Sequence, residues 1–186
     1  MIQSAKLPLS IPRRLQDNPT YLSFRSEAGR VLYSEDVYVG YRYYEKVDLK
    51  PLYPFGYGLS YSTFKLHDLH VDVDEMIQVS LSVSNSSPYA GAEVVQVYVA
   101  SMSATIERPI KELKAFRKVY LQARETRQVV IEMDTVLTTS YFHETRNQWC
   151  SEVGEYKLLI GTSSAETPLQ FPFKTVRTSY WSGLAP

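Results

Sequence analysis

The residues with the clearest potential for chemistry are two aspartates in a segment that alternates like a β-strand. Asp72 and Asp74 are two residues apart, so on a strand their side chains share a face at a spacing of about 7 Å. Two carboxyl groups about 5 to 9.5 Å apart are what glycoside hydrolysis requires. Glu75 follows directly at the expected strand end, where carboxylates are solvated. We therefore expect no catalytic role for this pair.

The histidines and serines offer no better catalytic or metal site. His67 and His70 are three residues apart on the same expected strand, so we predict that they point to opposite faces and share no metal ion. His143 and Glu144 begin a zincin-like motif, but Asn147 stands at the place of its second histidine. A serine nucleophile motif of the G-x-S-x-G type is absent. We expect no catalytic residue, no metal and no cofactor.

Composition argues against several classes of partner. The 186 residues carry 20 basic and 20 acidic side chains, a formal net charge of zero, which disfavours nucleic acid and anionic membranes as partners. No apolar run is long enough for a membrane span or for the core of a secretion signal, which favours an intracellular location. Cys150 is the only cysteine, so an intrachain disulfide is excluded and we expect a small core residue there.

The second part of the chain predicts an all-β fold. Apolar residues alternate with polar ones in repeated short runs separated by turn signals, the pattern of an immunoglobulin-like or fibronectin type III-like antiparallel sandwich of about seven strands. We expect one helical turn within 134–144, and Phe116 as an apolar anchor of a strand over 112–121. The predicted core comprises Val79, Leu81, Val95, Val97, Val129, Ile131, Leu158 and Ile160.

A possible modification site lies in one of the turns. Asn85 opens an Asn-Ser-Ser sequon, which would accept an N-linked glycan if the protein were exported.

Tyrosines concentrate in the first part of the chain, before the alternating runs. Eight of the fifteen tyrosines lie within residues 33–61, a segment that we call the aromatic belt. A tyrosine offers a flat apolar face with a polar tip, which suits both a domain interface and a sugar ring, and both interpretations stay open. Gly56 and Gly58 would permit a tight turn and form a hinge. The candidate contact residues are Tyr38, Tyr41, Tyr43, Tyr44, Tyr53, Phe55, Tyr57 and Tyr61.

Several motifs together resemble the C-terminal region of glycoside hydrolase family 3 β-glucosidases, particularly fungal ones. Residues 35–64 contain EDVYVGYRYYEK followed by PLYPFGYGLSYSTF, similar to the aromatic linker of that family. The segment SAKLPLSIP resembles the family's G-K-L-P-x-T-x-P sequence, with Ala5 in place of glycine and Ser10 in place of threonine. The final SYWSGL resembles the family's usual tail.

This resemblance implies a division of the chain and a supporting function. Residues 1–64 would be the end of an α/β-sandwich domain and the aromatic linker, and residues 65–186 a fibronectin type III-like domain with its tail. In the family both catalytic carboxyl groups lie upstream of the linker, so Met1 would open a truncated product, a gene-model fragment or a separately encoded tail. We expect an accessory portion that stabilises the catalytic domains of a β-glucosidase and is not catalytic alone. The β-glucoside substrate would be bound by the catalytic domains and not by this portion. The alternative is a free-standing carbohydrate-binding or protein-interaction module.

Overall fold

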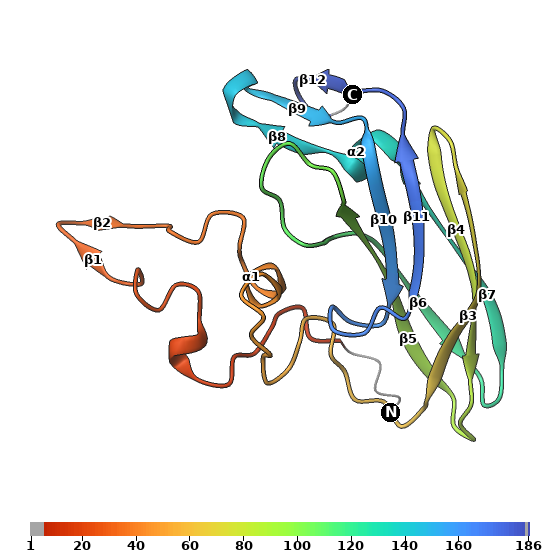
Figure 1. Ribbon diagram of the computed structural model, residues 1–186. Coiled ribbons are helices and arrows are strands. Elements are labelled where there is room, and N and C mark those ends of the chain that lie inside the picture. The colour runs from red at the N-terminus through yellow and green to blue at the C-terminus, as the bar shows by residue number, and fades with distance from the viewer. Residues whose placement is uncertain (1–5, 185) are drawn as a thin grey trace.

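Two antiparallel sheets packed face to face form the main body of the protein (Figure 1). The computed structural model describes residues 6–184 and 186. One sheet has three strands in the order β3-β4-β7 and the other has four in the order β11-β10-β5-β6, which confirms the predicted sandwich of about seven strands. The strands are β3 (Phe64–Val73), β4 (Met76–Asn85), β5 (Gly91–Ser101), β6 (Glu112–Leu121), β7 (Thr126–Asp134), β10 (Gly154–Gly161) and β11 (Leu169–Thr175).

The core lies between these two sheets and follows from the alternation of each strand. All eight predicted core residues are buried, and Val79, Val95, Val97, Leu158 and Ile160 have no exposed surface. Side chains two positions apart on a strand share a face, so each apolar run delivers one row of branched residues to the interior. The strand registers predicted from the sequence are therefore confirmed for these positions.

Strand β6 departs from the prediction at one residue. Phe116, expected as an apolar anchor, is 68% exposed. The register places Ala115 opposite the buried Val97 and Phe116 opposite Gln96, so Ala115 packs against the core while Phe116 lies on the outer face of an edge strand. Val119 and Leu121 are buried as expected.

The two histidines of β3 are also arranged differently from the prediction. His67 pairs with Ser82 and His70 with Ser80, and the register shifts between them. Asp68 adopts a left-handed φ of 54° at this bulge. Because a bulge inserts one extra residue, both histidines fall on the outer face and not on opposite faces as predicted.

A helical turn and a small third sheet cap one end of the sandwich. Helix α2 (Thr135–Thr139) is the predicted turn, and the Asp134 side chain caps it by accepting a hydrogen bond from the Leu137 amide at 2.8 Å. The small sheet was not predicted, and Cys150 is fully buried within it, as expected of a core residue. Its elements are β8 (Tyr141–His143), β9 (Gln148–Ser151) and β12 (Ser179–Trp181), with the 3-10 helix η2 (Glu144–Arg146) between the first two.

The region before β3 contains short elements where the sequence suggested an extended linker. Its far end projects away from the sandwich, and its helix lies close to the four-stranded sheet (Figure 1). Within the portion that the structure describes, no helix has the length and apolar character to cross a membrane. The elements are η1 (Leu15–Asp17), β1 (Ser26–Glu27), β2 (Arg30–Val31) and α1 (Tyr41–Lys46).

Candidate domain interface

The aromatic belt meets the sandwich at Tyr41 of helix α1. Its ring lies 5.3 Å from that of Phe55 and 5.7 Å from that of Tyr98, measured between centroids. Its hydroxyl accepts a hydrogen bond from the Leu113 backbone amide at 2.8 Å. Tyr98 stands on the outer face of β5 and is fully buried. The belt therefore covers the part of the outer face of the four-stranded sheet around Tyr98 and leaves Phe116 exposed, which explains why β5 is buried on both sides.

Gly56 fits against the same face of the sheet because it has no side chain. It adopts a positive φ of 81°, and a β-carbon there would collide with the Gln96 amide and lie 3.0 Å from the Ser163 α-carbon. Gln96 is held in place because its amide donates to the Thr162 carbonyl at 2.9 Å and its oxygen accepts from the Tyr98 hydroxyl. Gly58, the other candidate hinge residue, is half-buried.

An ion pair closes the contact beside Tyr98. Lys111 lies 2.9 Å from Glu45 of helix α1, donates to the Ser164 carbonyl at 2.6 Å and sits 5.4 Å from the centre of the Tyr98 ring. Burial raises the pKa of the Glu45 carboxyl above its usual value, although the Lys111 charge opposes that shift. Next to it on helix α1, Tyr44 is buried, so this helix is fixed to the sandwich by both apolar and charged contacts.

The remaining belt residues form contacts around the place where the belt meets the four-stranded sheet. Tyr53 and Tyr57 pack together at 4.9 Å between ring centres, and Tyr43 packs edge-on against Tyr44 at 5.4 Å. The Tyr38 hydroxyl donates to Glu107 at 2.8 Å. Tyr61 is the exception, since 78% of its surface is exposed. Most of the candidate tyrosines thus contact the protein's own chain, and their role toward a partner domain or a sugar stays a prediction.

A charged cluster that the sequence analysis missed lines a neighbouring cavity of about 670 Å³. Glu112 lies 2.7 Å from Arg108, 3.6 Å from Arg42 and 3.8 Å from Lys114. Burial works against the Glu112 charge, but Lys114 and Arg108 outweigh it and hold the pKa of that carboxyl below its usual range. Burial lowers the pKa of Lys114, partly offset by Glu112. The available signal was the spacing of Glu112 and Lys114, which places both on one face of β6.

The residues considered for catalysis or metal binding are not assembled into a site. Asp74 lies beyond the end of β3, both aspartates are exposed, and Asp72 lies 3.3 Å from His70. His143 ends β8 and Glu144 begins η2. Among the residues described by the structure, no three histidine, cysteine, aspartate or glutamate side chains are grouped so as to hold a metal ion.

Asn85, the candidate glycosylation site, is buried and hydrogen-bonded at the turn between β4 and β5. The side chain is 2% exposed, and its amide donates to the carbonyls of Tyr89 at 2.7 Å and Gln122 at 3.0 Å. Its oxygen accepts from the Ser87 amide at 3.0 Å. A glycan on this nitrogen would displace bonds that hold the turn between β4 and β5, so the folded domain has no room for it.

The two-sheet sandwich indicates the class of domain to which this chain belongs, and a family match agrees with it. Residues 93–164 match the family described as "Fibronectin type III-like domain", in agreement with the observed sandwich.

Relatives that match almost the entire chain are fungal β-glucosidases. The chain is 52% identical to "Probable beta-glucosidase I" of Aspergillus fumigatus over 190 residues, and 51% identical to the protein of the same name in Aspergillus oryzae over 191 residues. Each match covers 97% of this chain and 23% of the relative. The chain therefore spans about a quarter of the length of these curated relatives.

Solved structures of β-glucosidases contain the same fold. The crystal structure of the Kluyveromyces marxianus enzyme in complex with glucose matches 99% of this chain with a TM-score of 0.96 and 45% identity, over 22% of its own length. The Thermotoga neapolitana enzyme 3B matches 98% with a TM-score of 0.91 and 38% identity, over 26% of its length. The resemblance to the C-terminal region of family 3 β-glucosidases is thus confirmed. Ser4 and Ala5, which carried part of that resemblance, lie outside the described residues.

Proposed function

We propose that this chain is the C-terminal accessory portion of a β-glucosidase, which stabilises the catalytic domains and does not hydrolyse glycosides by itself. The observation that carries this proposal is the match of nearly all of this chain to only 22–23% of the fungal enzymes. The matched region contains a sandwich fully occupied by its own core. Asp72 and Asp74, the pair considered for hydrolysis, are exposed, and Glu112, in the cavity of about 670 Å³, is paired with Arg108 and Lys114. Hydrolysis therefore belongs to the catalytic domains of the complete enzyme.

The division of the chain is part of the same proposal. Residues 1–64 would comprise the end of an α/β-sandwich domain and the aromatic linker, and residues 65–186 the fibronectin type III-like domain with its tail. The start of β3 at Phe64 supports this boundary. Gly56 and Gly58 would shape the linker where it leaves the catalytic body, and the belt residues would fix the linker to the sandwich.

A carbohydrate-binding module is the alternative, and the belt argues against it. A stacking platform needs an aromatic face open to solvent. Tyr61 is open, but Tyr41, Tyr44 and Phe55 lie against the protein's own chain. This geometry favours a structural role for the belt over sugar contact.

The test is a chimeric enzyme assayed with an aryl β-glucoside. The matched region of the Aspergillus fumigatus relative is replaced by this chain, and hydrolysis by the chimera is compared with that of the parent enzyme and of this chain alone. We expect the chimera to be active and the chain alone to be inactive. An inactive, unfolded chimera, or turnover by the purified chain that disappears when its own acidic residues are replaced, would overturn the proposal.

A further inference from the structure

One segment of the chain has almost no contact with the sandwich. Residues 12–40, which we call the arm, leave the body after Ile11 pairs with Tyr53 and return at helix α1. Figure 1 shows the arm projecting away from the two sheets, with β1 and β2 at its far end. Within the described chain, every hydrogen bond of residues 14–37 stays inside the arm. Its hydrogen bonds to the rest are at its base, from Arg13 to the Lys50 carbonyl and from Tyr38 to Glu107. Asp36 and Val37, near the same base, line the cavity that also contains Glu112.

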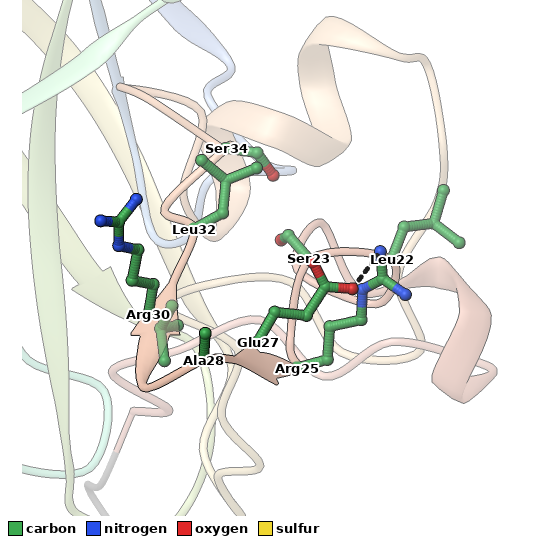
Figure 2. A pocket seen from close by; sticks show the side chains of 9 residues that line it. Leu22, Ser23, Arg25, Glu27, Ala28, Arg30, Leu32 and Ser34 are labelled. Atoms are coloured by element: carbon green, nitrogen blue, oxygen red, sulfur yellow. Dashed lines mark ion pairs between the residues drawn. The ribbon is translucent and has the colours of Figure 1, made fainter.

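The arm exposes large apolar side chains to solvent. Leu22 is 86% exposed and Phe24 is 84% exposed. A cavity of about 770 Å³ opens in the arm, and Figure 2 shows Leu22 and Leu32 on either side of the ion pair that Arg25 and Glu27 form across it at 2.9 Å. Seven apolar residues of the arm are each more than half exposed: Leu15, Leu22, Phe24, Val31, Leu32, Tyr33 and Val39.

The arm is too thinly packed to be stable without a partner. Fixing a backbone costs about 1–2 kcal/mol per residue, and an isolated two-stranded hairpin is marginal in water. Here each strand has two residues, joined by Ala28 and Gly29 with φ values of 50° and 74°. Positive φ at both positions defines a type I′ loop, and a non-glycine residue such as Ala28 adopts it at a cost. The shape of the arm therefore calls for contacts that this chain does not contain.

The charge of the arm indicates the kind of surface that it meets. Its four arginines are balanced by four acidic residues, so it has no net charge with which to attract nucleic acid or an anionic lipid surface. Aromatic side chains alone bury about 150–250 Å² each, so these seven exposed residues together offer an apolar area of several hundred Å², comparable to the largest patches on monomeric proteins. Such a patch fits an apolar protein surface.

We propose that the arm is the docking element that holds this accessory portion against the catalytic domains of the same polypeptide. This inference rests on the proposed function, and the occupant is the part of the enzyme that makes up the other three quarters of the matched relatives. A covalently linked partner acts at an effective concentration in the millimolar range, so it occupies the patch ahead of a second copy. The belt then has a different task, since it anchors the base of the arm to the sandwich.

The experiment compares arm variants in the chimera and in the isolated chain. Leu22→Ser combined with Phe24→Ser removes two exposed arm side chains, and Phe116→Ser is the matched control on the sandwich. In the chimera we expect the arm variant to shorten the activity half-life on heating by about tenfold or more, as loss of buried anchor residues does, and to release the arm to protease. The control should leave both unchanged. In the isolated chain neither variant should shift the thermal midpoint, because these side chains are each more than two thirds exposed.

The outcomes separate this inference from the proposed function. An active chimera whose arm variant behaves like the Phe116→Ser control would overturn the docking role and leave the accessory function standing. Failure of the unmutated chimera to fold would overturn the proposed function, and the docking role with it. The isolated chain would be examined by sedimentation. If it forms a dimer that is lost in the arm variant and kept in the Phe116→Ser control, the patch binds a second copy, which would contradict the proposal.

Discussion

The sandwich and the arm show how differently one chain can treat its apolar residues. In the sandwich, Val79 and Leu158 are fully buried between two sheets made by this chain alone. In the arm, Leu22 and Phe24 are almost fully exposed on a segment with two-residue strands. The same kind of side chain completes a core in one region and remains without one in the other. The sandwich is therefore a self-sufficient folding unit, whereas the arm depends on a surface outside this chain.

The largest expected effect is on the sandwich core. Leu158→Ala should lower the free energy of unfolding of the isolated chain by about 2–5 kcal/mol, because it removes a fully buried side chain and leaves a cavity. Leu32→Ala in the arm is the matched control and should change it by less than about 0.5 kcal/mol. Urea unfolding measures both. Equal losses for the two variants would show that the arm is packed as firmly as the sandwich.

A smaller loss of stability is expected when the charged cluster around Glu112 is broken. Glu112→Gln leaves Arg108 and Lys114 without their common carboxylate, which should cost about 2–3 kcal/mol after allowance for partial solvent screening. The control is Glu155→Gln, which breaks the exposed pair with Lys174 and should leave the urea midpoint unchanged. If Glu112→Gln were equally silent, the cluster would not contribute to holding helix α1 against strand β6.

Breaking the contact between the aromatic belt and the sandwich should lower the free energy of unfolding by less. Tyr41→Phe keeps the ring contacts with Phe55 and Tyr98 and removes only the acceptor for the Leu113 amide, a loss of about 1 kcal/mol. Tyr33→Phe, at an exposed arm position, is the control and should be neutral. Thermal unfolding of both variants distinguishes a belt that is bonded to the sandwich from one that merely lies beside it.

The smallest effect is the pH dependence that Glu112 contributes. Its pKa in the folded protein lies below the ordinary value of 4.5, so its contribution to stability is present above that value and is lost as the pH falls through the folded pKa. Glu45 acts in the opposite sense, since its raised pKa gives a contribution that is present at low pH and is lost as the pH rises. Below pH 4.5 the wild type should lose more stability than Glu112→Gln, measured by urea midpoints. A larger acid loss in the variant would contradict this assignment.

The sequence predicted the sandwich because each strand carries its own evidence. Alternation within a run such as Ile77 to Val83 specifies both the strand and the face that is buried. The errors occurred where a partner strand or a bulge decides the outcome. Phe116 was placed inside because it is apolar, but the register with β5 turns it outward. The bulge at Asp68 likewise moved His67 and His70 to one face.

The candidate interface was less predictable, for a physical reason. The sequence indicated the aromatic belt from its composition, but that composition does not say which surface the tyrosines meet. Tyr41 reaches Leu113 across a separation of 72 residues, a contact that no local pattern encodes. The exposed residues of the arm were missed because exposure is a property of the folded chain, and Leu22 or Phe24 looks like a core residue in the sequence.

Amide hydrogen exchange tests the contrast between these regions most directly. It would be measured for the isolated chain and for the chimera with the Aspergillus fumigatus relative, under the same conditions. The account predicts that sandwich amides such as those of β5 and β10 are protected equally in both proteins. Amides of residues 14–37 should exchange rapidly in the isolated chain and become protected in the chimera. Arm amides that are already protected in the isolated chain, or that remain unprotected in an active chimera, would contradict it.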